Sequence, residues 1–400
     1  MPGDGTKLAT TTHNRPNARL LDLTRLVRRA GRVLTGVDRV ELAYLRALQD
    51  APEPLYGLIR SRLGYILLDP NGIASVTHIL SGPDGTPPDQ QNKVAWRLAR
   101  RNAIGRVPPF GLPRMLRRHL PVGTSYLNTG HSNLTERVLR TLKAAGIPIA
   151  IFVHDVIPIE FPQYQREGTV GPFTAMIARV GTYADTVIYN SEDTKRRTEA
   201  LFPGRVPAPI VAHLGTDFVA ARFDELPDGL PPAPPYFVVI GTIEPRKNHA
   251  FLLDLWDAMG ADAPTLVIAG SRGWKNDDVF ARLDALPPDG GGIREVSGLS
   301  DGALSALVDG SAGVLLPTHA EGFGMPAVEA ALRGVPVVVN TLEVFGEMLG
   351  DIPIYASVSD RYLWISTINT LADAGPRTPK HPQFEPPSWD VHFKTVLRLT

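Results

Sequence analysis

Short runs rich in Ile, Val and Leu alternate with longer helical patterns along most of this chain, and this alternation limits its possible folds more than any other feature. Strands that alternate with helices form βαβ units, whose strands lie parallel in one sheet. Two series of such units are visible. In the first, the predicted strands are Arg19–Leu23, Gly64–Leu68, Pro148–Val153, Thr186–Tyr189 and Pro209–His213, and the predicted helices include Val37–Gln49 and Val170–Ala184.

A proline-rich segment separates the two series. Residues 226–235 read LPDGLPPAPP, and the five prolines remove backbone donors and hold the chain extended. The second series starts directly after this segment. Its predicted strands are Tyr236–Ile240, Thr265–Ala269, Gly313–Leu316 and Val335–Val339, with helices from Asn248, Asp301 and Pro326 and a last helix capped by Ser388.

The length of 400 residues exceeds what one hydrophobic core usually serves, so two domains are expected. The expected division is an N-terminal Rossmann-like domain over residues 1–217, a linker over 218–235, a second Rossmann-like domain over 236–386 and a C-terminal helix over 387–400. The fold class predicted is therefore α/β, with two doubly wound domains.

Charge and cysteine content exclude several classes of function. The 41 basic residues balance the 41 acidic ones, so no net field favours nucleic acid, and no nucleic-acid partner is expected. The absence of cysteine excludes disulfides, thiolate nucleophiles and thiolate zinc sites. Residues 1–17 lack the apolar core of a signal peptide, and no run of about 18 apolar residues occurs, so a cytoplasmic protein is expected.

The most informative motif is EGFGMPAVE, which begins at Glu321 after a predicted buried strand. Gly322 and Gly324 allow the backbone to approach a ligand closely, and Pro326 suits the first turn of a helix whose free N–H groups attract anions. Glu329 in that turn can accept hydrogen bonds from vicinal hydroxyls. Glu321, on the loop, can then reach the other end of the same ligand.

Two basic residues, Arg246 and Lys247, lie between the first strand of the second series and the next helix. At that place their charges can neutralise a diphosphate, both when it binds and when it leaves. No Asp-x-Asp triplet occurs in the chain, so the common means of holding a divalent ion on a nucleotide sugar is missing. No metal and no cofactor are therefore expected.

In order and spacing, these motifs resemble those of family 4 glycosyltransferases (glycosyl transferases group 1), and of mannosyltransferases in particular. The resemblance is strong over residues 236–348, moderate over 150–217 and weak before 125. It implies the GT-B fold, in which two Rossmann-like domains face each other across a cleft, a reaction that retains the anomeric configuration, and no metal. The segments that carry it are GTIEPRKN from Gly241, LVIAGSRGW from Leu266, VSGLSD from Val296 and the two glutamates of EGFGMPAVE.

The resemblance also implies roles for individual residues. Lys247 would bind the diphosphate, Glu329 the ribose hydroxyls, and Glu321 the donor sugar. The predicted catalytic residues are Glu321, His154, Arg246 and Lys247, and the predicted donor-binding residues are Gly36, Thr242, Gly270, Phe323, Gly324, Met325 and Glu329.

Three segments of the N-terminal half contribute further candidates. HDVIP begins with His154 at the end of a predicted strand, where open α/β sheets bind ligands, so His154 can hydrogen-bond a donor hydroxyl or face the positive charge at the anomeric carbon. TGVDR opens a helix, and its Gly36 lets the backbone approach the diphosphate. Asn128 and His131, in NTGH, are expected to line the acceptor side. For each segment a purely structural role stays open.

The segment from Lys93 to Pro121 contains eight Lys or Arg residues and no acid. A basic segment with exposed apolar anchors can dock on anionic lipid, so peripheral contact with the inner face of the cell membrane is expected. The alternative is a solvated helix and loop. The candidate anchors are Trp96, Leu98, Phe110, Leu112, Met115 and Leu116.

Together these features predict transfer of a hexose from a nucleotide-diphosphate sugar to a glycan or lipid-linked acceptor in bacterial surface polysaccharide synthesis. The HDVIP segment favours GDP-mannose as the donor, with a UDP-hexose or a deoxysugar donor as alternatives. An epimerase or a phosphorylase on the same fold also stays open, as does a subunit that binds nucleotide sugar without transferring it.

Overall fold

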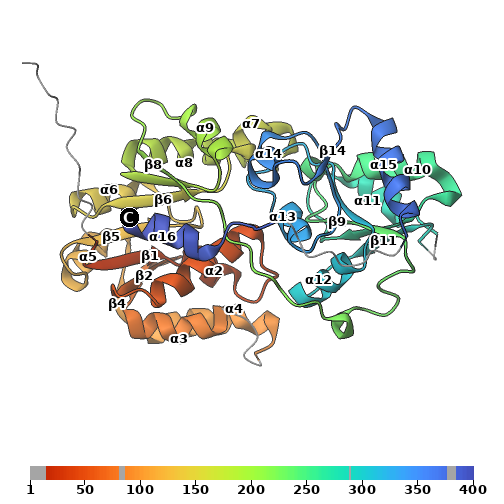
Figure 1. The fold of residues 1–400 in the computed structure, drawn as a ribbon. Coiled ribbons are helices and arrows are strands. Elements are labelled where there is room, and N and C mark those ends of the chain that lie inside the picture. The colour runs from red at the N-terminus through yellow and green to blue at the C-terminus, as the bar shows by residue number, and fades with distance from the viewer. Residues whose placement is uncertain (1–14, 81–85, 288–289, 376–383) are drawn as a thin grey trace, which may run out of the picture.

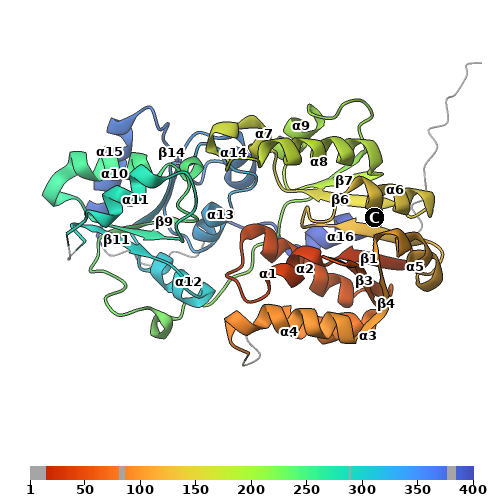
Figure 2. The same ribbon diagram turned by 180° about the vertical axis from the view of Figure 1, so that it is seen from behind.

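The computed structural model describes residues 15–80, 86–287, 290–375 and 384–400. Two α/β domains lie side by side, each with a central sheet between layers of helices (Figures 1 and 2). This arrangement confirms the predicted fold class.

The N-terminal sheet has eight strands, and one of its edges differs from the prediction. All neighbouring strands are parallel except for the third strand, which is antiparallel to the second and the fourth. Only residues 62–63 connect the second strand to the third, and so short a connection allows only a hairpin. The strands are β1 (Ala18–Asp22), β2 (Leu55–Ser61), β3 (Gly64–Leu68), β4 (Ala103–Val107), β5 (Thr124–Asn128), β6 (Ile149–Val153), β7 (Thr186–Tyr189) and β8 (Ala208–Val211), in the order β4-β3-β2-β1-β5-β6-β7-β8.

Helices cover both faces of this sheet because successive strand side chains point to opposite sides. Leu21 packs with one layer and its neighbour Leu20 with the other. The first layer holds α1 (Thr24–Arg29), α2 (Gly36–Gln49), α3 (Pro70–Leu80) and α4 (Pro88–Arg101), and the second holds α5 (Leu112–His119), α6 (Glu136–Ala144) and α8 (Val170–Tyr183). Two more helices, α7 (Ile157–Glu160) and α9 (Glu192–Glu199), follow β6 and β7.

The second domain has a fully parallel six-stranded sheet. Its strands are β9 (Tyr236–Ile240), β10 (Thr265–Ala269), β11 (Ile293–Val296), β12 (Gly313–Leu316), β13 (Val337–Val339) and β14 (Ile354–Tyr355), in the order β11-β10-β9-β12-β13-β14. One face packs against α10 (His249–Met259), α11 (Asp277–Asp284) and α15 (Arg361–Asp373), and the other against α12 (Asp301–Asp309), α13 (Met325–Leu332) and α14 (Glu343–Leu349).

The C-terminal helix α16 (Trp389–Leu399) packs on the N-terminal domain, so the chain crosses back after its second sheet (Figure 1). Ser388 caps this helix by accepting a hydrogen bond from the backbone N–H of Val391 at 3.3 Å. His392 and the hydroxyl of Tyr44 share a hydrogen bond of 2.7 Å, and Arg19 donates to the carbonyl of Leu397 at 3.0 Å. The contacts of His392 and Leu397 tie α16 to α2 and β1.

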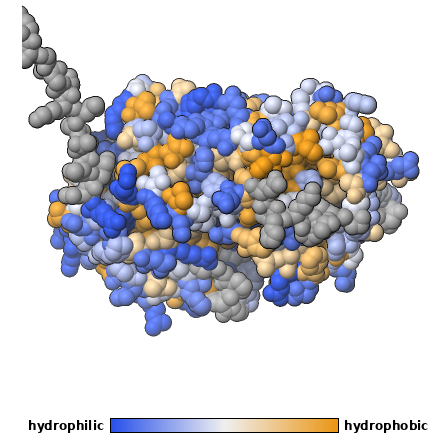
Figure 3. Space-filling view, viewed as in Figure 1, coloured by the Kyte–Doolittle hydropathy of each residue, from blue (hydrophilic) through white to orange (hydrophobic). Residues whose placement is uncertain are grey.

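The basic segment from Lys93 to Pro121 is less apolar on its surface than expected. Leu112, Met115 and Leu116 are 0%, 3% and 1% exposed, because they face the core beneath α5, whereas Phe110 is 82% exposed. On the face seen in Figure 3, apolar residues form separate groups among hydrophilic ones. Three of the six expected anchors are therefore core residues, and Trp96 and Leu98 are half-buried against the core. Within the described residues, no helix combines the length and apolar character needed to cross a membrane.

Candidate active site

A cavity of about 550 Å³ lies between the two domains. A larger groove of about 1030 Å³, between α2 and α16, adjoins it and shares Arg39, Met325 and Glu329. The predicted catalytic and donor-binding residues all line the smaller cavity: Gly36, His154, Thr242, Arg246, Lys247, Gly270, Glu321, Phe323, Gly324, Met325 and Glu329.

Glycines let the turns after β9 and β10 pass close to each other beside the cavity. A Cβ on Gly270 would lie 1.9 Å from the carbonyl oxygen of Gly241, so only glycine fits there. Gly324 has φ of 85° and directly precedes α13, where a Cβ would meet the ring of Phe345 at 2.6 Å. Packing within the protein therefore requires both glycines, whether or not a ligand binds.

Four charged residues, Lys247, Arg246, Glu321 and Glu244, meet in a buried cluster beside the cavity. Lys247 Nζ donates to Oε1 of Glu321, and Arg246 Nη1 lies 3.2 Å from Oε2 of the same carboxylate. Arg246 also donates to Glu244 Oε1 at 2.6 Å and to the carbonyl of Ala320 at 2.6 Å. The side chains of Lys247, Glu321 and Arg246 are only 10%, 11% and 17% exposed.

The two cations of the cluster favour the charged form of Glu321. Burial by itself raises the pKa of Glu321, but the charges of Lys247 and Arg246 outweigh burial and hold this pKa below its usual value. Burial also lowers the pKa of Lys247, and the charge of Glu321 opposes that effect. An anionic ligand at the two cations would therefore compete with Glu321 and release its carboxylate for another partner.

Glu329 lies in α13 and contacts the N-terminal domain. Its Oε1 accepts a hydrogen bond from Arg39 of α2 at 3.0 Å, and Arg39 also pairs with Asp301 of α12. Arg39 was not among the predicted site residues, although it belongs to the TGVDR segment. Its partners could not be predicted because they come from the other domain.

The start of α2 delivers Arg39 to this place. Thr35 caps the helix and forms a capping box with Asp38, which fixes where the helix begins. A Cβ on the next residue, Gly36, would lie 2.4 Å from Cε of Met325, so the start of α2 touches the first residue of α13. The absence of a side chain at Gly36 therefore allows the two domains to approach each other closely at the edge of the cavity.

His154 directly follows β6 and is neutral. Its Nε2 lies 2.6 Å from the carbonyl oxygen of Thr129, and because a carbonyl only accepts, Nε2 carries the proton. Nδ1 is then unprotonated and can accept a hydrogen bond. Burial lowers the pKa of His154 well below its usual value. Nδ1 of His154 can thus accept a hydrogen bond from a hydroxyl group in the cavity.

The structure does not bring Asn128 and His131 into this cavity. Asn128 is 1% exposed and donates to the hydroxyl of Tyr126 at 2.9 Å and to the carbonyl of Ser132 at 2.7 Å. His131 Nε2 bonds the carbonyl of Phe152 at 2.9 Å, and burial lowers the pKa of His131 to about 4. Both side chains form hydrogen bonds within the N-terminal domain, so their placement does not support the predicted acceptor role.

No group of three or more His, Asp or Glu side chains is arranged to hold a metal ion within the part of the chain that the structure describes. Among the described residues, the cations that line the cavity are Arg246, Lys247, Arg29 and Arg39. Arg29 pairs with Asp38, and Arg39 pairs with Glu329 and Asp301.

Comparisons with known proteins agree with this architecture. Residues 224–352 match the family model described as glycosyl transferases group 1. Among solved structures, Anabaena Alr3699/HepE in complex with UDP-glucose is similar over 94% of this chain and 95% of its own, with a TM-score of 0.63 and 15% identity. At that identity the likeness shows the fold, which is GT-B.

Curated relatives match part of the chain. The serotype-specific mannosyltransferase WbdA of Escherichia coli is 27% identical over 249 residues, which are 58% of this chain and 29% of WbdA. The O-antigen chain mannosyltransferase B of Escherichia coli is 34% identical over 128 residues, which are 31% of this chain and 33% of that protein. The matches thus span about a third of these relatives, and they confirm the resemblance to group 1 glycosyltransferases of mannosyltransferase type.

Proposed function

We propose that this GT-B protein, with its group 1 glycosyltransferase segment, transfers a hexose from a nucleotide-diphosphate sugar to a glycan or lipid-linked acceptor, with retention of the anomeric configuration. The observation that carries the proposal is the convergence of Lys247, Arg246, Glu321 and Glu329 in one cavity between the domains. Mannose from GDP-mannose is the donor we favour, because the similar curated proteins are named mannosyltransferases, one of them an O-antigen chain mannosyltransferase. Bacterial surface polysaccharide synthesis is then the proposed role.

In the proposed reaction, Lys247 and Arg246 bind the diphosphate and stabilise the charge that develops on it as the sugar leaves. The free N–H groups at the start of α13 add to this stabilisation. Glu321, released from its two cations, accepts hydrogen bonds from sugar hydroxyls, and His154 Nδ1 accepts another. The acceptor hydroxyl attacks from the face that the diphosphate leaves, and a phosphate oxygen takes its proton, so the chain supplies no separate base.

The alternatives handle the same ligands differently. An epimerase would return an isomerised nucleotide sugar, a phosphorylase would need orthophosphate as its acceptor, and a binding subunit would leave the donor unchanged. The buried cation pair of Arg246 and Lys247 favours a reaction in which a diphosphate leaves, because binding alone does not require stabilisation of a developing charge.

The choice of donor can be tested by thermal unfolding with GDP, UDP, dTDP and ADP and with their sugars. A ligand that binds only the native state stabilises it by about 2.7 kcal/mol at a concentration 100 times its Kd. We expect GDP and GDP-mannose to raise the melting temperature most. A larger effect of UDP sugars would replace GDP-mannose in the proposal, and no effect of any nucleotide would contradict it.

Glu329→Ala is expected mainly to raise the donor KM, by about tenfold or more, with a smaller change in kcat. Loss of a carboxylate that holds ribose hydroxyls in both ground and transition states weakens binding uniformly. Arg39 keeps Asp301 as a partner in this variant, so the fold should be retained. Steady-state kinetics with varied donor measures the effect, with Glu136→Ala on α6 as a control. An unchanged KM with a collapsed kcat would show that Glu329 acts in the chemical step.

We also propose peripheral contact with anionic membrane through the basic segment, carried by charge and by exposed Phe110 rather than by the buried anchors. Wild-type protein should bind liposomes that contain an acidic phospholipid, and binding should fall as salt rises, because charges are screened over about 8 Å at physiological ionic strength. Liposome binding should be abolished when Gln replaces four exposed arginines, Arg100, Arg101, Arg117 and Arg118. Each basic residue near the membrane surface contributes about 1 kcal/mol to the binding free energy.

The control variant replaces Arg137 and Arg140 of α6 with Gln. These two residues lie outside the basic segment, so their replacement should leave liposome binding intact. Failure of the wild type to bind acidic liposomes even at low salt would show that the segment is a solvated surface.

A further inference from the structure

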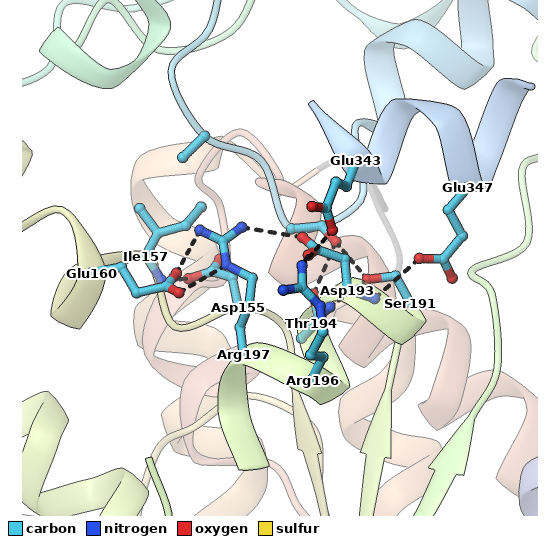
Figure 4. Close-up of polar contacts among 12 residues, drawn as sticks. Asp155, Ile157, Glu160, Ser191, Asp193, Thr194, Arg196, Arg197, Glu343 and Glu347 are labelled. Carbon is cyan, nitrogen blue, oxygen red and sulfur yellow. Dashed lines mark hydrogen bonds and ion pairs between the residues drawn. The ribbon is translucent and has the colours of Figure 1, made fainter. Parts of the chain in front are cut away.

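The N-terminal end of α9 meets two parts of the second domain at once: the loop that carries Glu321, and helix α14 (Figure 4). Ser191 caps α9 by accepting a hydrogen bond from the backbone N–H of Thr194 at 3.0 Å. A helix of the N-terminal domain therefore borders the loop to which the proposed function assigns the donor sugar.

Two side-chain hydroxyls from this end of α9 hold one carbonyl of that loop. Ser191 Oγ donates to the carbonyl oxygen of Gly322 at 3.3 Å, and Thr194 Oγ1 donates to the same oxygen at 3.1 Å. Ser191 and Thr194 are 0% and 3% exposed. Gly322 is also confined on another side, because a Cβ there would lie 2.5 Å from the carbonyl oxygen of His154.

Planarity of the peptide unit extends this contact to the neighbouring residues. In a trans peptide the C=O of Gly322 and the N–H of Phe323 point in opposite directions, so holding the carbonyl toward α9 directs the N–H of Phe323 away from α9. Glu321 precedes the same glycine. The held carbonyl thus fixes the peptide plane between Gly322 and Phe323 directly, and it restricts Glu321 through the backbone of Gly322.

A carboxylate of the second domain joins α14 to the same end of α9. Glu347 accepts hydrogen bonds from the backbone N–H groups of Glu192 at 2.7 Å and Asp193 at 3.1 Å (Figure 4). Its Oε1 also lies 2.9 Å from His213 Nε2. Burial by itself raises the pKa of Glu347, but these hydrogen bonds lower it overall, so the carboxylate stays charged. The first turn of α9 has free N–H groups that suit such a partner.

Ion pairs hold α9 in its own domain and add to its contact with α14. Arg197 lies 2.6 Å from a carboxylate oxygen of Glu160 in α7 and 3.1 Å from one of Asp193. Arg196 pairs with Glu343 of α14 (Figure 4). The helix is therefore a fixed element between the domains.

We propose that Thr194 and Ser191 are positioning residues for the donor site: through the carbonyl of Gly322 they orient Glu321 and the backbone N–H of Phe323. The donor loop then has its working conformation only while α9 of the opposite domain is docked on it. The expected effect on the reaction rests on the proposed function. The contact between α9 and the donor loop is independent of that function.

The test compares three substitutions in one helix. Thr194→Val removes the hydroxyl but keeps the shape, and Thr194→Ser restores the hydroxyl. Thr198→Val is the matched control, because Thr198 is also fully buried and its hydroxyl bonds only the carbonyl of Thr194 at 2.7 Å. The measurements are hydrogen exchange of the amides from Glu321 to Met325 in the protein without added nucleotide, and kcat and donor KM.

We expect Thr194→Val to speed exchange in this loop by about fivefold, the effect of one neutral hydrogen bond. We expect its kcat to fall by about tenfold with little change in KM, since misplaced groups slow the chemical step. Thr194→Ser should recover both values, and Thr198→Val should change neither beyond its effect on the melting temperature.

Two outcomes would overturn the inference. One is loop exchange in Thr194→Val equal to that in Thr198→Val. The other is faster exchange with kcat unchanged, which would make the contact structural only. If the wild type transfers no sugar while Thr194→Val still frees the loop, the proposed function fails, and the control of the loop by α9 is nonetheless supported.

Discussion

Lys247→Ala is expected to lower the rate of sugar transfer by at least about a hundredfold, because loss of one preorganised contact to a developing charge typically has an effect of this size. The substitution removes the ammonium group that pairs with Glu321. Glu321 keeps Arg246 at 3.2 Å, so no buried carboxylate is left without a cation and the protein should stay folded.

Single-turnover kinetics with saturating donor measures this effect, because it isolates the chemical step. Lys143→Ala, which removes a lysine from the exposed pair with Asp185, is the control and should transfer at the wild-type rate. Near-normal transfer by a folded Lys247→Ala variant would show that Lys247 does not stabilise the leaving diphosphate.

Glu321→Ala should lower transfer by at least about a hundredfold as well, for a different reason. It removes the carboxylate to which we assign the donor sugar, and it leaves Lys247 buried without its anion. Removing one partner of a buried pair is destabilising by about 3 to 5 kcal/mol, so the melting temperature should fall more than in Lys247→Ala.

Glu321→Gln separates the two effects of this substitution. Glutamine keeps the volume and one oxygen that can accept from Lys247, so stability should return most of the way, while the lost negative charge keeps transfer slow. Wild-type turnover in both variants would show that Glu321 only neutralises the cations.

The parts of the fold that the sequence predicted are those where local pattern decides the structure. β9, β10 and β12 have the predicted bounds, because parallel strands buried on both faces read as continuous apolar runs. β2 was missed, since Gly57 and the polar end at Arg60 and Ser61 interrupt its pattern. The packing of α16 on the N-terminal domain depends on contacts nearly 350 residues apart in sequence, such as Tyr44 with His392, which no local pattern records.

The same distinction holds for the site. Glu321, Glu329, Arg246 and Lys247 stand in motifs whose spacing indicates a ligand, and the structure brings them to one cavity. Arg39, Thr194 and Glu347 were not predicted, because each acts across the domain boundary and its partner depends on how the domains dock. Asn128 and His131 have polar side chains after a strand, as ligand-binding residues often do, but their hydrogen bonds are internal.

The central claim is that this cavity transfers a sugar with retention, and analysis of the product by NMR tests it most directly. Purified protein is incubated in excess EDTA with GDP-mannose and mannose-terminated oligosaccharides, and with the sugar of any other nucleotide that stabilises it. We predict one released nucleoside diphosphate per new glycosidic bond, and a product with the anomeric configuration of the donor. A product of inverted configuration, an isomerised donor, or activity that is lost in EDTA and restored by manganese would contradict this account.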